Sequence, residues 1–412
     1  MAEGRAITTG CCIAGGGPAG VMLGFLLARA GVDVVVLEKH SDFLRDFRGD
    51  TVHPSTLEVM HELGLLEAFL KRPHQKLHSL HGQVGALETE VANFTSLPTR
   101  CNFIAMMPQW DFLDFLTQAG RKYPGFHLLM DAEVEDVLVE DGRVVGLTAQ
   151  TAQGPLTVAA RLVVGADGRH STVRERAGLK VLDLGASIDV LWMRLPRRPH
   201  DRAQSLGRFD AGRIFVMIDR GDYWQCAYVI PKGGITAIKA AGLPRLRKAV
   251  GEMAPDMVDR LDALASWDDV KLLNVSLDRL EQWWRPGLIC IGDSAHAMSP
   301  VGGVGINLAI QDAVAAANLL AGPLRRGTPT DAELAAVQKR RLFPTRVTQA
   351  AQKLVQERMI QQVLEDTGPT PPPWPFRLLR RFPVLRRLPA RAVGLGVRPE
   401  HVRTVEAASS PH

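Results

Sequence analysis

Three glycines near the beginning of the chain have the spacing of a phosphate-binding turn. Gly15, Gly17 and Gly20 form the pattern G-x-G-x-x-G, with Pro18 and Ala19 between the last two glycines. We predict a strand directly before this pattern and an apolar helix directly after it. The first glycine permits a tight turn, the second lets the backbone approach a pyrophosphate, and the third lets helix and strand pack closely. Free N–H groups at the helix start favour phosphate charge, so the pattern predicts a nucleotide site.

A carboxylate follows at the position where such a site uses one. Residues 32–37 are nearly all apolar, as in a parallel strand that is buried on both faces. Glu38 ends this strand eighteen residues after Gly20, and Lys39 comes next. A carboxylate at the end of this strand can accept hydrogen bonds from a ribose.

Two further motifs follow short apolar segments later in the chain. Asp167-Gly168 opens the sequence D-G-R-H-S-T-V-R after residues 162–165, and Gly292-Asp293 follows residues 288–291. Asp-Gly alone marks a turn, whereas an Asp after a buried strand can hold a polyol hydroxyl. A glycine-rich run then leads into a helix predicted over 305–320, whose first backbone amides can face a flat anionic group. The candidate cofactor-binding residues of this glycine-rich run and the helix start are Pro300, Gly303, Gly305, Ile306 and Asn307.

In this order the three motifs resemble those of the FAD-dependent aromatic hydroxylases, the group A flavoprotein monooxygenases related to 4-hydroxybenzoate hydroxylase. The resemblance covers roughly residues 7–320. It implies that Glu38 binds the adenosine ribose, that Asp293 binds the ribityl chain, and that the amides of 305–307 face the flavin pyrimidine. It also implies cofactor contacts for Arg48, within F-R-G-D, and for Gln109.

The resemblance implies a monooxygenase that uses NADH or NADPH and O2. Such an enzyme hydroxylates or epoxidises an aromatic, phenolic or polycyclic small molecule through a flavin C4a-hydroperoxide. The Asp167-Gly168 motif is associated in this family with both FAD and the reduced nicotinamide, so no second dinucleotide pattern is expected. The protein orients the substrate and excludes water, while the cofactor performs the oxygen chemistry. His296 is the one candidate for a catalytic side chain, and packing or hydrogen bonding near the cofactor is its favoured interpretation.

Other activities on the same fold are alternatives. A flavin-dependent reductase of an isoprenoid or quinone-like substrate has slight support from the apolar C-terminal tail. Flavin-dependent halogenases resemble one another in a Trp-x-Trp-x-Ile-Pro sequence. A halogenase is disfavoured, because the nearest match here is C-A-Y-V-I-P at residues 226–231, which lacks both tryptophans. A non-catalytic FAD-binding protein is disfavoured by the completeness of the motifs.

The candidates for the substrate pocket lie in a β-rich insert. Residues 187–240 are predicted to be all-β, and a pocket and a sheet core would draw on the same side chains. The pocket candidates in this insert are Trp192, Met217, Trp224 and Tyr228. His74, His78 and His81 have a spacing that can suit zinc, yet they lack Cys or carboxylate partners, so a solvated loop is favoured.

Charge and composition limit the partners. The net charge is +5, but residues 377–403 hold eight arginines and one acid, so the rest of the chain is mildly acidic. This distribution disfavours nucleic-acid binding, which uses basic residues spread over a folded face. The arginine-rich tail is interpreted first as an extension packed over the domains, and second as a weak peripheral contact with anionic lipid.

The five cysteines show no CxxC pairing, which favours a reducing, cytoplasmic location. The apolar residues 11–27 are interrupted by glycines and Pro18, so a signal peptide is not expected there. No transmembrane span is expected elsewhere. A monomer or a homodimer is expected.

The order of predicted elements indicates an α/β fold. We expect a Rossmann-type FAD-binding domain (4-hydroxybenzoate hydroxylase-like), interrupted by a β-sheet substrate domain and followed by C-terminal helices. Local signals include a helix starting at Ser55 with the capping box S-T-L-E, a hairpin turn at Asp141-Gly142, and a loop or antiparallel hairpin over 74–98. The expected boundaries are 1–75, 100–182 and 270–325 for the FAD-binding domain, 76–99 and 183–269 for the substrate domain, and 326–412 for the C-terminal helical region and basic tail.

Overall fold

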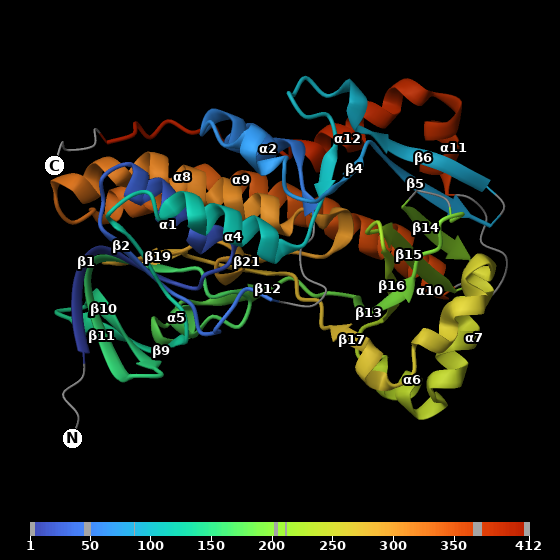
Figure 1. The fold of residues 1–412 in the computed structure, drawn as a ribbon, viewed down its shortest axis with the longest axis horizontal. Helices are drawn as coiled ribbons and strands as arrows, with labels where there is room; N and C mark the ends of the chain where they lie inside the picture. Colours follow the sequence, from blue (N-terminus) through green and yellow to red (C-terminus); the bar gives the residue numbers. More distant parts are fainter. Residues whose placement is uncertain are drawn as a thin grey trace.

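The first strand, helix and second strand form a parallel β–α–β unit, visible at the left of Figure 1. β1 (Arg5–Ala14) pairs in parallel with β2 (Val34–Leu37), and α1 (Pro18–Arg29) connects them. The last six residues of β1 and all of β2 are buried. Continuous apolar runs therefore suit both strands.

The computed structural model describes residues 5–44, 51–85, 87–201, 205–210, 212–365 and 373–407. Arg48, which was predicted to contact the cofactor, lies outside these described residues.

This unit belongs to an eight-stranded sheet. The order across the sheet is β19 (Trp284–Arg285), β20 (Leu288–Cys290), β11 (Gly154–Gly165), β1, β2 and β8 (Phe126–Leu129). The five strands from β20 to β8 are parallel to one another. β11 is also extended by an antiparallel hairpin, β9 (Ala132–Glu140) and β10 (Arg143–Thr151). The turn of that hairpin is at Asp141-Gly142 as predicted, with φ of 46° and 78°, the left-handed values that a tight hairpin turn needs.

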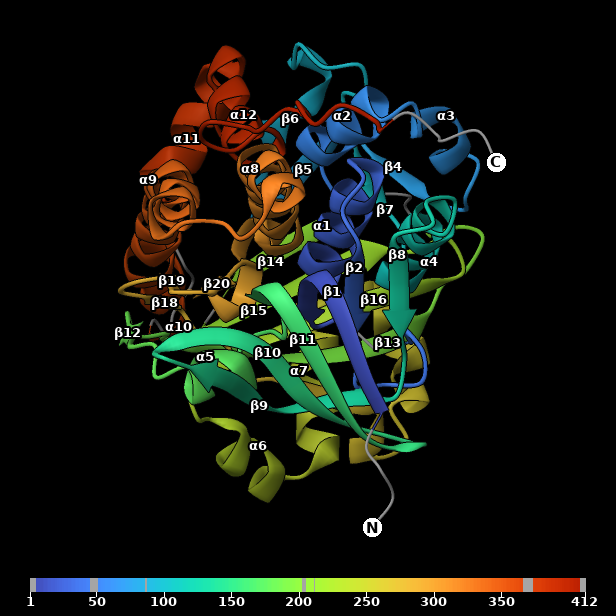
Figure 2. The ribbon, with the colours of Figure 1, turned by 90° about the vertical axis from the view of Figure 1, so that its left-hand side faces the viewer.

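Helices cover one face of this sheet, as Figure 2 shows. They are α1, α4 (Gln109–Gly120) and the long α8 (Gly305–Arg326), with α9 (Asp331–Val355) beside α8. Among the described residues one segment, Val301–Arg326, is long and apolar enough to cross a membrane, and 78% of its most apolar window is buried inside the protein. This degree of burial is typical of a helix in the core of a protein.

A second, seven-stranded sheet forms the other lobe, at the right of Figure 1. Its order is β17 (Val270–Leu273), β13 (Ile188–Pro196), β16 (Tyr223–Pro231), β15 (Arg213–Asp219), β14 (Leu206–Asp210), β5 (Ser79–Val84) and β6 (Leu87–Asn93). The antiparallel pair β5–β6 is the hairpin expected within 74–98. β17 belongs to this sheet because it pairs with β13. The sheet therefore extends just past the expected domain boundary at residue 269.

Two local predictions are wrong. The expectation that 187–240 is all-β fails after β16, where α6 (Ile235–Ala241) and α7 (Leu243–Met253) follow a glycine turn. The predicted capping box at Ser55 does not form, because α2 (Pro54–Glu62) begins one residue earlier with His53 at its N-cap. The Glu58 carboxylate instead accepts a hydrogen bond from the backbone N–H of Arg100 at 2.6 Å.

The C-terminal region packs along both lobes. α9 continues into a π-turn, η6 (Gln356–Ile360), and α10 (Gln361–Glu365), and α11 (Trp374–Arg381), η7 (Pro383–Arg386) and α12 (Arg387–Gly394) lie over the β5–β6 hairpin. Residues 395–407 then return along α8 and α1. The backbone N–H of Ala407 donates to the Arg29 carbonyl at 2.9 Å, and the Asn318 side chain donates to the carbonyl of His401 at 2.8 Å. The last described residues are thus packed, as the first interpretation of the tail expects.

Candidate active site

The three sequence motifs meet at one edge of the eight-stranded sheet. They follow the carboxyl ends of β1, β11 and β20, which are parallel neighbours. A Cβ added to Gly292 would lie 3.1 Å from the Cβ of Ala19 and 3.3 Å from the Cβ of Ala309. The loop after β20 is therefore packed between the starts of α1 and α8.

The glycines of the first motif have three different environments. Gly15 has φ +104°, and a Cβ there would lie 2.3 Å from the carbonyl oxygen of Ala166. A Cβ on Gly20 would lie 1.9 Å from the carbonyl oxygen of Gly15. Around Gly17, no atom of the described residues other than its chain neighbours lies within 4 Å of a Cβ. Gly17 is the N-cap of α1, and no side chain caps this helix start. The open space therefore lies at a helix start whose N–H groups suit a phosphate.

Glu38 is buried at the end of β2 and binds to this turn. Its Oε2 accepts a hydrogen bond from the backbone N–H of Gly16 at 2.9 Å, and its Oε1 accepts one from the backbone N–H of His40 at 3.1 Å. Lys39, next in the chain, is exposed. The structure thus brings Glu38 beside the glycine turn.

Asp293 lies in a short turn, η4 (Gly292–Ser294), between two firmly held neighbours. The backbone N–H of Gly292 donates to Asp312 at 3.1 Å, and the hydroxyl of Ser294 donates to the carbonyl of Gly165 at 2.5 Å. The Asp293 carboxylate is partly exposed and has no hydrogen-bond partner in the described part of the chain. It is therefore available to a ligand.

The glycine-rich loop before α8 is joined to β3 (Thr51–Val52). In the turn η5 (Val301–Gly303), Gly302 and Gly303 have φ of +81° and +62°, which favour glycine. The Thr51 hydroxyl donates to the carbonyl of Gly303 at 3.0 Å. The Asn307 side-chain oxygen accepts the backbone N–H of His53 at 2.9 Å. The loop and the start of α8 thus have a fixed position relative to β3.

The other predicted residues of this region border the same loop. Pro300 directly precedes η5, and Gly305 and Ile306 are the first two residues of α8. Gln109 begins α4, three residues after β7 (Ile104–Met106), which pairs with β3.

His53 is a buried residue of this site that sequence reasoning missed, because no motif marks it. Its Nδ1 donates to the carbonyl of Val393 in α12 at 2.8 Å, which leaves Nε2 as a hydrogen-bond acceptor. Nε2 is buried without a partner among the described residues and lies 3.7 Å from where a Cβ on Gly303 would be. Burial lowers the pKa of His53 to about 4, although the bond to Val393 opposes this shift. The ring is therefore neutral at pH 7.

The carboxylate of the second motif is engaged within its own loop. Asp167 accepts hydrogen bonds from the hydroxyl of Ser171 at 2.5 Å and from the backbone N–H of Val173 at 3.1 Å, at the start of α5 (Thr172–Arg176). Burial raises the pKa of Asp167, and these bonds oppose the increase. Gly168 has φ +85° and open space around a Cβ position. In this motif the backbone of Gly168, rather than the Asp167 carboxylate, is free to meet a ligand.

His296 belongs to a buried ionic network. Its Nε2 lies 2.6 Å from Asp312 Oδ2, and Arg341 Nε donates to Asp312 Oδ1 at 2.8 Å. Arg341 also approaches Glu400 at 3.3 Å. Burial alone would raise the pKa of Asp312, but His296 and Arg341 hold it below its usual value. These contacts hold His296 behind the Gly292 turn, and its partners were not foreseen because they come from other segments of the chain.

The two faces of the seven-stranded sheet have different coverings. Trp192 lies on the face, here called the inner face, that packs against α10 and against Val301 of the glycine-rich loop. Its indole Nε1 is buried and has no hydrogen-bond partner in the described residues. Side chains alternate between faces along a strand, so the neighbours of Trp192 in β13 point the other way, toward α7.

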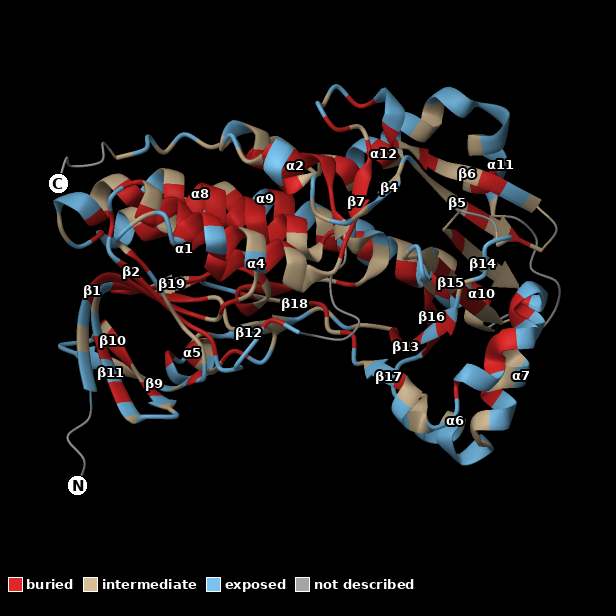
Figure 3. Ribbon diagram, in the orientation of Figure 1, coloured by how far each residue is buried: buried red, intermediate tan, exposed pale blue. Residues whose placement is uncertain are grey.

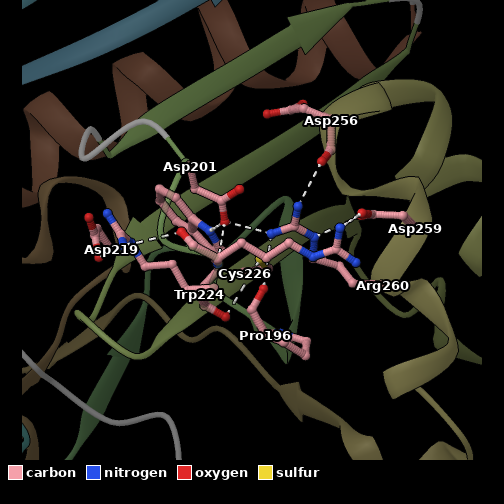
Figure 4. Close-up of polar contacts among 10 residues, drawn as sticks. Pro196, Asp201, Asp219, Trp224, Cys226, Asp256, Asp259 and Arg260 are labelled. Atoms are coloured by element: carbon pink, nitrogen blue, oxygen red, sulfur yellow. Dashed lines mark hydrogen bonds and ion pairs between the residues drawn. The ribbon is translucent and has the colours of Figure 1, made fainter.

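Met217, Trp224 and Tyr228 lie on the outer face, in the core covered by α7. The Trp224 indole N–H donates to Asp201 at 2.9 Å, and Arg260 donates to the same carboxylate at 2.5 Å (Figure 4). Burial alone would raise the pKa of Asp201, but the hydrogen bonds from Arg260 and its other donors hold it well below its usual value. These three residues form sheet core, and of the four pocket candidates only Trp192 is on the side of the cofactor loops.

The histidines near residue 80 have other neighbours. His74 Nδ1 lies 2.8 Å from the carbonyl of Arg72, and His81 Nε2 lies 2.9 Å from the Ser79 hydroxyl. The His78 ring packs edge-on against Phe103. In the described ranges no group of three or more His, Cys, Asp or Glu could hold a metal ion.

A parallel sheet with a glycine turn at a helix start, a carboxylate after its second strand and two further loops at the same edge defines a dinucleotide-binding fold. The sequence matches the family described as FAD binding domain over residues 8–351. The chain belongs to this family and to its FAD-dependent aromatic hydroxylases. The predicted family, fold class and cofactor are thereby confirmed.

Similar proteins agree with this assignment. 6-Methylpretetramide 4-monooxygenase of Streptomyces rimosus is 34% identical over 335 residues, which cover 81% of this chain and 80% of the relative. The structure of PqsL, a probable FAD-dependent monooxygenase from Pseudomonas aeruginosa, has a TM-score of 0.73 at 22% identity, with 87% of this chain and 98% of that chain covered. OxyS anhydrotetracycline hydroxylase from Streptomyces rimosus has a TM-score of 0.73 at 23% identity, with coverage of 96% and 77%. At these identities the two structures show the shared fold alone. The chain is an FAD-dependent monooxygenase, a class that typically uses NADH or NADPH.

Proposed function

We propose that this enzyme hydroxylates a polycyclic phenolic compound that binds against the inner face of the seven-stranded sheet. When bound, FAD would supply the redox chemistry of hydride acceptance from NADH or NADPH and O2 activation, by which one oxygen atom enters the substrate and the other leaves as water. The protein's own residues bind FAD, orient the substrate and exclude water.

The residues at the sheet edge fit an extended FAD. The open space at Gly17 suits the pyrophosphate, Glu38 beside it suits the adenosine ribose, and the free carboxylate of Asp293 suits the ribityl hydroxyls. The start of α8, from Gly305 to Asn307, would face the pyrimidine end of the flavin. A helix N-terminus there stabilises negative charge by a few tenths to about 2 kcal/mol.

One observation carries the placement of the substrate. Trp192 and Val301 belong to the same apolar cluster, so the inner face of the sheet meets the loop that would hold the flavin. The buried N–H of Trp192 has no partner among the described residues, so it is a donor that a phenol or carbonyl oxygen of the substrate would satisfy. The names of two similar proteins, a 6-methylpretetramide 4-monooxygenase and an anhydrotetracycline hydroxylase, support a polycyclic substrate.

The test is a screen of phenolic, quinone and polycyclic compounds with the FAD-loaded enzyme. We expect a true substrate to accelerate NADPH or NADH oxidation, to yield a product containing one atom from labelled O2, and to release little hydrogen peroxide per nicotinamide consumed. Product without oxygen from O2 would indicate a reductase. Halide-dependent product would indicate a halogenase. Peroxide equal to the nicotinamide consumed for every compound would overturn the monooxygenase with this substrate class.

We propose a monomer or homodimer, and we propose a reducing cytoplasmic compartment because all five cysteines are buried and unpaired. Size-exclusion chromatography with light scattering tests the oligomeric state.

A further inference from the structure

Residues 374–391, which we call the arginine–apolar segment, comprise α11, η7 and the first five residues of α12. Figure 3 colours most of this segment as exposed. Large apolar side chains are among the exposed residues: Trp374 at 72%, Phe382 at 50%, Val384 at 64% and Leu388 at 65%. An exposed group of large apolar side chains marks an interaction surface.

The segment is held as a folded surface by its inward side. Phe376 is buried, with its ring 6.1 Å from the Phe209 ring. Arg386 pairs with Glu90 of β6 at 2.7 Å. A Cβ on Gly394 would lie 2.7 Å from Leu97, which shows how closely the end of α12 approaches the body of the protein. The exposed side chains therefore project from a fixed position.

The charge on the segment has one sign. Residues 373–399 contain seven arginines and no acidic residue. The exposed arginines of the segment are Arg377, Arg380, Arg381, Arg387 and Arg391. They alternate along the chain with the exposed apolar residues. This mixture of cationic and apolar side chains, with a tryptophan, is the composition of a segment that lies in a membrane interface.

We propose that the arginine–apolar segment docks this enzyme on an anionic membrane surface. A second copy of this chain fits the surface less well, because a symmetric pair would bring arginines against arginines. Nucleic acid fits less well because aliphatic side chains such as Val384 and Leu388 offer nothing to phosphates and do not stack on bases. Lipid headgroups satisfy the arginines and the acyl boundary accepts the apolar side chains.

The segment is also next to the candidate active site. Val393 lies at the end of α12, and its carbonyl accepts a hydrogen bond from His53. The side chain of Val393 lies 3.7 Å from where a Cβ on Gly302 would be. Docking would therefore bring the glycine-rich loop close to the bilayer. If the proposed function holds, an apolar substrate or product can exchange with the lipid phase there, but docking itself does not depend on that function.

The test is sedimentation of the full-length, FAD-loaded protein with vesicles. One set contains phosphatidylcholine alone, and the other contains phosphatidylcholine and phosphatidylglycerol in equal amounts. We expect binding at least about tenfold tighter to the anionic vesicles, weakening as salt is raised. Equal binding to both sets, or no binding to either, would overturn the proposal.

Two variants assign the binding to this surface. Trp374→Ser/Phe382→Ser/Leu388→Ser and Arg380→Glu/Arg381→Glu should each reduce anionic-vesicle binding by at least about tenfold. Matched controls at exposed positions elsewhere, Leu272→Ser in β17 and Arg325→Glu/Arg326→Glu at the end of α8, should bind like the wild type. FAD content and melting temperature should be unchanged in all four.

Three further results would contradict the proposal. If both surface variants bind anionic vesicles as tightly as the wild type, another region of the protein meets the membrane. Equal loss in the Arg325/Arg326 control would mean that total charge, not this surface, controls binding. A surface variant that converts a dimer into a monomer in the absence of vesicles would assign the surface to a second copy of the chain. The same readouts apply whether or not a hydroxylation substrate is found, so failure of docking and failure of the proposed function are distinguishable.

Discussion

A side-chain carbon placed on Gly20 would lie 1.9 Å from the carbonyl oxygen of Gly15. Both residues are in the phosphate turn, so the turn and α1 can pack as they do only if position 20 lacks a side chain. We predict that Gly20→Ala destabilises the protein by roughly 1–3 kcal/mol, because the backbone must shift to relieve the clash. Urea denaturation of the FAD-free protein measures this loss.

Gly17→Ala is the matched comparison. Its Cβ would meet no described atom within 4 Å apart from its chain neighbours, and its φ of −74° is ordinary for alanine. The FAD-free protein should therefore unfold like the wild type, while FAD affinity falls at least about tenfold, or ~1.4 kcal/mol, because the methyl occupies pyrophosphate space. Unchanged FAD affinity would remove the pyrophosphate from this position.

Asp293 and Asp167 should respond differently to removal of the carboxylate. Asp293→Ala should weaken FAD binding by roughly 1–3 kcal/mol without lowering the stability of the FAD-free protein, because Asp293 has no protein partner in the described residues. Asp167→Ala should lower stability itself by a similar roughly 1–3 kcal/mol, because Ser171 and the N–H of Val173 lose their acceptor. FAD titration beside denaturation separates the two, and equal losses of both quantities for Asp293→Ala would make that residue structural.

Trp192 and Trp224 test which face of the sheet meets the substrate. Trp192→Phe should raise the KM for a substrate found in the screen and leave stability nearly unchanged, because its N–H has no protein partner in the described residues. Trp224→Phe should reduce stability by roughly 1–2 kcal/mol, because its N–H donates to Asp201. Its KM should stay at the wild-type value. The reverse pattern in steady-state kinetics would place the pocket on the face that α7 covers.

His53 should make stability depend on pH. Its pKa is lowered from 6.5 to about 4 in the folded protein, so the unfolded chain takes up the proton at the higher pH. The stability from His53 is therefore complete above about pH 6.5 and is lost as pH falls toward 4, with about 2 kcal/mol lost between pH 7 and 5.

His53→Asn is the control for this titration. The asparagine N–H can still donate to the carbonyl of Val393, but it does not ionise. We expect the free energy of unfolding to fall less from pH 7 to 5 in this variant than in the wild type. Identical pH profiles from urea denaturation would show that His53 does not titrate as expected.

Local chemistry made the place of the candidate cofactor site at one sheet edge predictable from sequence. The glycine turn, Glu38 and the Asp167 and Asp293 motifs each follow an apolar strand segment, and parallel strands place such loops at one edge of a sheet. The hairpin at Asp141-Gly142 was predictable for a similar reason, since its positive φ values belong to the turn itself. These features depend on residues close together in the chain.

The features that sequence did not predict depend on contacts between distant segments. His53 meets Val393, and Glu400 reaches the Asp312 network through Arg341, with no spacing to announce either contact. Alternation along β13 and β16 shows that each strand has two faces, but Trp192 and Trp224 look alike in that pattern. Tertiary structure distinguishes them, because α7 covers one face and α10 with the glycine-rich loop approaches the other. A period of two residues determines that neighbouring side chains oppose each other, whereas the packing of the whole chain decides which of them lies on the side of the glycine-rich loop.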